Sequence, residues 1–179
     1  MPASTLSLLI ALIPFACAAL LVAAAASDLA ARLIPNRIPA LLLGLGLVFH
    51  LAQGTLLAGL LVAAIVFAVL LVAWHFGVMG GGDVKLLAAT AFCVAPVTVP
   101  LLIMRVALAG GVLGLAYLVA RRTVRAPVGA APHGATRSFT AGCVALPGRV
   151  WRAERWRIGR HAPLPYGIAI AVGGLLTLI

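Results

Sequence analysis

Long apolar runs separated by short polar connectors constrain this chain more than any other feature of its sequence. Of its 179 residues, 64% are hydrophobic and 9% are charged, which is too apolar a composition for a soluble domain of this length. Six runs approach the ~20 residues that a helix needs to cross a bilayer. We expect them at residues 6–26, 38–52, 56–79, 84–103, 106–120 and 163–179. The sequence therefore predicts an all-α polytopic membrane protein, a bundle of six transmembrane helices.

A polar insert at residues 121–161 separates the fifth and sixth runs. It holds nine arginines, and its second half mixes tryptophan with arginine, a composition suited to contact with an anionic leaflet. We expect residues 1–179 to form a single membrane domain in which this insert is a basic cytoplasmic loop. No basic residue precedes the first run, so we expect that run to be a retained helix rather than a cleaved signal peptide.

The distribution of basic residues predicts the orientation of the chain. The formal net charge is +10, but it lies in connectors between apolar runs, which indicates cytoplasmic loops rather than a nucleic-acid-binding face. If the insert is cytoplasmic, alternation of six spans puts twelve of the thirteen basic residues inside, leaving only Arg105 outside. Both termini then lie outside, and Asp28 and Asp83 lie together on the cytoplasmic face.

Acidic residues are scarce in this chain, which has only Asp28, Asp83 and Glu154. A carboxylate within a span costs ~2.5–3.5 kcal/mol on insertion scales and usually faces a partner or a water-filled cavity. Two carboxyls that share a proton can hydrolyse a peptide bond, because repulsion keeps one ionised and the other neutral. A structural alternative stays open, in which Asp83 caps the fourth helix and Asp28 pairs with Arg32 at i+4.

The connectors beside the two aspartates carry further candidate residues. Three glycines at positions 80–82 precede Asp83, and because glycine lets another peptide approach closely, we expect an unwound entry there along which a substrate strand lies. Lys85, the only lysine, is expected to anchor the chain at the interface. Pro35 disfavours helix at the preceding residue, and Asn36 is expected to cap the second helix.

The three cysteines, Cys17, Cys93 and Cys143, are far apart in sequence and in predicted location. Because there is no C-x-x-C pair, neither a zinc site nor a redox pair is indicated. We expect Cys17 and Cys93 to be small apolar packing residues, and we predict no metal and no cofactor.

Three segments together resemble a known family. Residues 80–86, Gly-Gly-Gly-Asp-Val-Lys-Leu, resemble the G-x-G-D signature of the type IV prepilin peptidases. Asp28, followed by Ile-Pro-Asn at residues 34–36, resembles the region of their first catalytic aspartate. Residues 165–169, Pro-Tyr-Gly-Ile-Ala, are similar to the segment that opens their last helix. The three motifs occur in the expected order and cover most of the chain.

The resemblance implies a multi-pass aspartic protease of the bacterial inner membrane that cuts the short basic leader from pilin-like precursors, after a glycine, on the cytoplasmic side. Asp28 and Asp83 match the catalytic pair. Gly80, Gly81, Gly82, Lys85, Pro35 and Asn36 are the candidate substrate-binding or supporting residues. The connector after the first run is about ten residues long and has no cysteine. The chain therefore resembles the short form without a methyltransferase domain, which serves tight-adherence (Flp-type) pili, and we expect no N-methylation.

Two other functions are compatible with the residues. The two aspartates would also serve as a relay in a small proton-coupled transporter, although the chain shows no internal repeat of the kind many transporters have. A non-catalytic subunit of pilus or secretion assembly would use the arginine-rich insert as a docking surface. The expected partners are a pilin precursor and membrane lipids, with no nucleic acid, and the oligomeric state is open.

Overall fold

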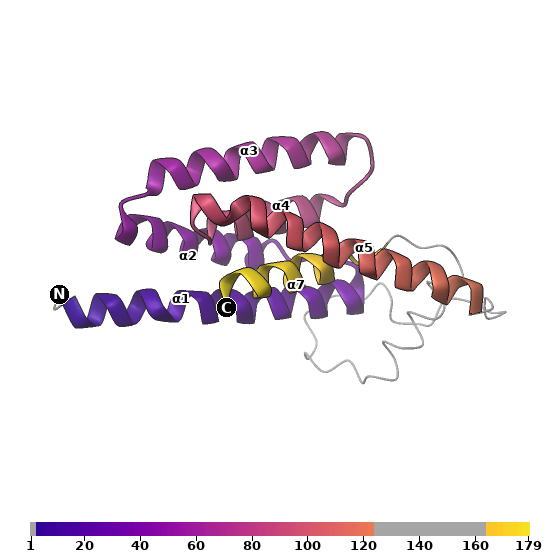
Figure 1. The fold of residues 1–179 in the computed structure, drawn as a ribbon, viewed down its shortest axis with the longest axis horizontal. Helices are drawn as coiled ribbons and strands as arrows, with labels where there is room; N and C mark the ends of the chain where they lie inside the picture. Colours follow the sequence, from indigo (N-terminus) through magenta and orange to yellow (C-terminus); the bar gives the residue numbers. More distant parts are fainter. Residues whose placement is uncertain (1–2, 124–163) are drawn as a thin grey trace.

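All regular structure in the described part of the chain is helical (Figure 1). The computed structural model describes residues 3–123 and 164–179. Its helices are α1 (Ala3–Ala31), α2 (Arg37–Gln53), α3 (Leu56–His75), α4 (Gly81–Phe92), the 3₁₀ turn η1 (Pro96–Thr98), α5 (Val99–Thr123) and α7 (Tyr166–Leu178). The predicted all-α class is confirmed.

Three helical segments are long and apolar enough to cross a membrane: Ile10–Ala31, Leu56–His75 and Pro96–Arg122. The other described helices are shorter. The shortest, α4, has 12 residues and a length of about 18 Å, well below the ~30 Å of a hydrocarbon core. The multiple apolar helices agree with a membrane protein.

Helix α4 forms the centre of the bundle. It packs against α2, α3 and α7, and α7 in turn packs against α1 and α5 (Figure 1). Most of α4 is buried, including Leu86, Thr90 and Phe92. Residues 86–92 of α4 are all buried, as expected of a helix segment that other helices surround. The start of this central helix carries Asp83.

The first helix is longer than the sequence predicts. The apolar run was expected to end at residue 26, but α1 continues to Ala31 and therefore includes Asp28 in its last turn. The helix ends where Arg32 takes the left-handed conformation, with φ +54°, and its backbone N–H donates to the Asp28 carbonyl oxygen at 2.8 Å. Helices often end with such a residue, although it is usually glycine.

The boundaries predicted for the fourth and fifth spans are wrong. Helix α4 ends at Phe92, and α5 begins at Val99 and includes Arg105, which was expected in a connector. Pro96 starts the short η1 turn between them. Pro100 is tolerated in the first turn of α5, where its missing N–H leaves no helical hydrogen bond unmade.

Arg105 instead closes the far end of α7. Its guanidinium donates to the Leu176 carbonyl oxygen and to Thr177 Oγ1, the latter at 3.3 Å. Arginine near a helix C-terminus satisfies free carbonyl groups and interacts favourably with the helix dipole. This contact fixes the end of α7 opposite to the one that meets Asp28.

We predict that Arg105→Gln lowers the free energy of unfolding by about 1 kcal/mol, because the C-terminal carbonyls of α7 lose a charged donor. Reversible unfolding in mixed detergent micelles measures this change. Arg122→Gln, a change at an exposed residue of the same helix, is the matched control and should leave stability unchanged. Equal stability of both variants would contradict the role given to Arg105.

The structure also corrects the placement of the cysteines. Cys17 of α1 and Cys93 at the end of α4 are both buried, and their thiols are close enough to interact. The Cys93 thiol also lies 3.1 Å from the Leu42 carbonyl oxygen. Cys143 lies outside the described residues, as does the insert except for its first residues, which complete α5.

Candidate active site

Asp28 is held where α1 meets the start of α7. Its side chain is buried, with 6% of its surface exposed, and its Oδ2 accepts a hydrogen bond of 2.9 Å from the Gly167 backbone N–H. Gly167 has no room for a side chain, because a Cβ there would lie 2.8 Å from the Asp28 Cβ and Oδ2. The glycine of the Pro-Tyr-Gly segment therefore allows this close approach.

Asp28 lies between two helix ends of opposite polarity, the C-terminus of α1 and the N-terminus of α7. A negative charge is unfavourable in the last turn of α1, where carbonyl oxygens point outward. The first turn of α7 presents free N–H groups and the positive end of its dipole to the same carboxylate. The hydrogen bond from Gly167 shows that the start of α7 supplies a donor to the Asp28 carboxyl group.

Asp83 lies in the first turn of α4 and is half-buried. The predicted unwound entry is wrong, because α4 already begins at Gly81 and Gly80 occupies the N-cap position in an extended conformation. Asp83 is therefore not the N-cap residue. Its side chain turns back toward Gly80, which provides a backbone hydrogen bond. A carboxylate at this third helical position commonly satisfies the N-cap N–H in this way.

The two aspartates share one electrostatic environment. The pKa of Asp83 is raised to about 6, mainly by burial and also by the negative charge of Asp28. The Gly80 hydrogen bond and the positive charge of Arg32 act in the opposite direction. Within residues 3–123 and 164–179, the buried Oδ1 of Asp83 accepts no hydrogen bond. A carboxyl with this pKa can hold a proton near neutral pH.

The glycines before Asp83 allow close packing rather than unwinding. A Cβ at Gly81 would lie 3.3 Å from Trp74 Nε1, and one at Gly82 would lie 3.4 Å from Ile34 Cβ. These contacts join the start of α4 to the end of α3 and to the Ile-Pro-Asn connector. The backbone that carries Asp83 is therefore fixed from two sides.

Lys85 and Asn36 directly link the Gly-Gly-Gly-Asp segment to the Ile-Pro-Asn connector. The ammonium group of Lys85 donates to Asn36 Oδ1 at 3.2 Å, and both side chains are exposed. The expected capping of α2 by the Asn36 side chain does not occur, because its oxygen accepts from Lys85 instead. Pro35 lies between Ile34 and Asn36 in the connector, outside any helix.

Arg32 is a site residue whose role sequence reasoning missed. It was considered only as an ion-pair partner of Asp28 along one helix. In the structure its left-handed backbone ends α1, its guanidinium donates to the Tyr117 hydroxyl of α5 at 3.4 Å, and its charge acts on Asp83. A non-glycine residue at positive φ is uncommon and often marks a functional site. Nothing in the local sequence pointed to Tyr117.

Apolar helices that bring two carboxyls together at one end of a bundle form the arrangement expected of a membrane aspartic protease. The sequence model of the type IV leader peptidase family matches residues 15–115. This match covers more than half of the chain and includes both aspartates, so the protein belongs to that family and is an aspartic prepilin peptidase. The prediction of its enzyme class is confirmed. No curated protein and no solved structure gives a significant match.

Proposed function

We propose that Asp28 and Asp83 form the catalytic pair that activates water to remove the leader from pilin-like precursors. Membership of a leader peptidase family supports this substrate class and favours catalysis over a transporter or a docking subunit. The observation that carries the proposal is electrostatic: the charge of Asp28 acts on Asp83 although they come from different helices. A like charge that raises the pKa of a neighbouring carboxyl supports a carboxyl dyad.

The environments of the two carboxyls suggest separate roles. Asp28, which accepts from the start of α7, is the ionised base that takes a proton from water as its oxygen attacks the scissile carbonyl carbon. Asp83, with its raised pKa, is the neutral acid that gives its proton to the carbonyl oxygen. The tetrahedral intermediate then collapses: one of its hydroxyl protons returns to Asp83, its C–N bond breaks, and the proton held by Asp28 passes to the leaving nitrogen.

Six residues support the pair in this proposal. Gly81 and Gly82 allow the contacts with Trp74 and Ile34 that fix the start of α4, and Gly80 provides a backbone hydrogen bond to Asp83. Asn36, which follows Pro35, bonds Lys85 and ties the connector to α4. These residues position the acid through the backbone rather than through contact with the reacting atoms.

We further propose how the protein is arranged in the bacterial inner membrane. All six described helices would lie in the bilayer as one domain, with α4 as its buried core helix. The bias of basic residues toward alternate connectors supports a cytoplasmic active site, a cytoplasmic insert at residues 121–161 and both termini outside. The short connector between α1 and α2, Arg32–Asn36, supports the form without a methyltransferase domain that processes Flp-type pilins.

The proposed roles predict how cleavage depends on pH. Asp83 must be protonated, and its pKa is about 6, so its active form predominates below that pH and is lost as pH rises through it. We expect kcat/KM to fall on an alkaline limb that begins near pH 6 and approaches tenfold per pH unit. Initial rates on a fluorogenic precursor peptide measure the profile, with re-assay at pH 6 as the control for inactivation. A rate that rises steadily to pH 8 would contradict the acid role of Asp83.

Co-expression with candidate precursors tests the substrate. The protein is expressed with a Flp-type pilin precursor or with a major type IV pilin precursor, and the mass of the product is measured. The proposal predicts loss of the leader mass from the Flp-type precursor, after a glycine, with no added methyl group. Processing of the major pilin alone would reject the Flp assignment but not the peptidase.

A further inference from the structure

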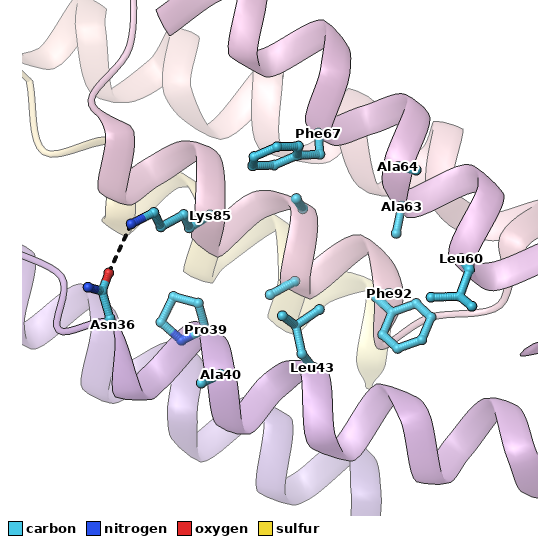
Figure 2. Close-up of a pocket in the computed structure, with 12 residues that line it drawn as sticks. Asn36, Pro39, Ala40, Leu43, Leu60, Ala63, Ala64, Phe67, Lys85 and Phe92 are labelled. Carbon is cyan, nitrogen blue, oxygen red and sulfur yellow. Dashed lines mark hydrogen bonds between the residues drawn. The ribbon is translucent and has the colours of Figure 1, made fainter.

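An apolar groove lies between α2 and α3, over α4, and has a volume of about 480 Å³ (Figure 2). Three sets of four residues line it, each spaced i, i+3, i+4 and i+7: one on α3, one on α4 (Lys85, Ala88, Ala89 and Phe92), and one formed by Asn36 at the N-cap of α2 with three residues of that helix. This spacing places four side chains along one face of a helix. The groove therefore follows the helices for about 10 Å.

One end of the groove carries several hydrogen-bond donors. Lys85 donates to Asn36 Oδ1, which leaves the Asn36 amide N–H groups and the remaining ammonium protons of Lys85 to bind a ligand. Arg37, the next residue in sequence, is also exposed. A cation beside an amide donor is suited to a phosphate oxygen.

The rest of the groove is apolar. Alanines form much of its lining, and Leu43, Leu60 and Phe92 surround the end remote from Lys85 (Figure 2). An extended peptide there would leave its backbone groups without partners. A bilayer-spanning helix, ~30 Å long, would have to pass over Leu43, Leu60 and Phe92. A flexible hydrocarbon chain needs neither hydrogen bonds nor a straight path.

We propose that this groove binds one acyl chain of a membrane phospholipid, with the lipid phosphate held by Lys85 and Asn36. The acyl chain lies over Ala88 and Ala89, and the head group lies at the N-terminal end of α4. Neither Asp28 nor Asp83 lines the groove, although Lys85 and Asn36 also support the start of α4 in the proposed catalytic site. Because Lys85 follows Asp83 by two residues and Asn36 belongs to the connector, a bound lipid would also hold these two segments together.

Photo-crosslinking in nanodiscs tests the site. The full-length protein is placed in bilayers of phosphatidylcholine and phosphatidylglycerol that contain phosphatidylglycerol with a diazirine in one acyl chain, and labelled peptides are mapped. We expect labelling concentrated on the groove residues of α2, α3 and α4. Ala64→Leu on α3, or Ala40→Leu on α2, narrows the groove and should reduce this labelling at least fivefold. Ala68→Leu, an exposed residue of α3 outside the groove, is the matched control.

Lys85→Gln tests the phosphate contact. The preference of the groove for phosphatidylglycerol over a phosphatidylcholine probe should fall about fivefold, the effect of one surface cation on an anionic lipid. Uniform labelling of all lipid-facing helices, equal labelling of the Ala64→Leu and Ala68→Leu proteins, or an unchanged preference in Lys85→Gln would overturn the proposal. Loss of groove labelling when a pilin-like precursor is added would assign the groove to the substrate and would also overturn it.

Discussion

Replacing either aspartate by asparagine is expected to reduce leader removal by ~10³-fold or more, because an amide neither accepts the proton of water nor supplies one of its own at this pH. Asp28→Asn keeps an oxygen that can accept from the Gly167 N–H, and Asp83→Asn keeps the size of the side chain at the start of α4. Both proteins should therefore insert and fold. The measurement is the mass of a co-expressed precursor.

Glu154→Gln is the matched control, since Glu154 is the remaining acidic residue of the chain, and it should process the precursor normally. The two aspartate variants should fail equally, and the double variant should be no worse than either, because residues that act as a unit are not additive. Wild-type processing by either Asp28→Asn or Asp83→Asn would reject the pair.

Gly167→Ala is expected to reduce kcat by about 10²-fold, the cost of displacing a catalytic group by about 1 Å. The added methyl group would lie 2.8 Å from the Asp28 side chain, so either α7 or Asp28 must move. The loss should fall on kcat more than on KM, because the change acts on the carboxylate rather than on the precursor's binding surface. Initial rates at several precursor concentrations separate the two constants.

Gly111→Ala provides the control for Gly167→Ala, because a Cβ at Gly111 of α5 would meet nothing within 4 Å. Its kcat should match the wild type or exceed it slightly through better helix propensity. Equal rates for the two alanine variants would show that the contact between Gly167 and Asp28 does not position the base.

The fold class was predictable because it depends on local composition. Apolar runs near bilayer length report helices directly, and the all-α class follows from them. Boundaries depended on packing instead. Pro96 and Pro100 both looked like interruptions, but only Pro96 lies at a break, since Pro100 falls in the first turn of α5. Arg105 was wrongly expected in a connector because of the same misjudged boundary.

The candidate site was predictable only in part, because its residues are distant in sequence. Asp28 and Asp83 stood out as acids beside apolar runs. The role of Gly167 depends on its contact with Asp28, 139 positions away. A single sequence does not show which distant segment will pack against a given glycine. The meeting of Cys17 and Cys93 and the contact between Arg32 and Tyr117 are likewise tertiary. The expected unwound entry failed because the glycines allow close packing of Trp74 and Ile34.

Chemical bridging of positions 28 and 83 measures their proximity most directly. The double variant Asp28→Cys/Asp83→Cys, made in a protein whose three native cysteines are replaced by alanine, is treated in native membranes with dibromobimane, which fluoresces only when it joins two nearby thiols. Asp28→Cys/Arg105→Cys, which pairs position 28 with the opposite end of α7, is the control. The catalytic-pair proposal predicts strong intramolecular fluorescence from the first variant and none from the control. Single labelling of both thiols in the first variant without a bridge would contradict it.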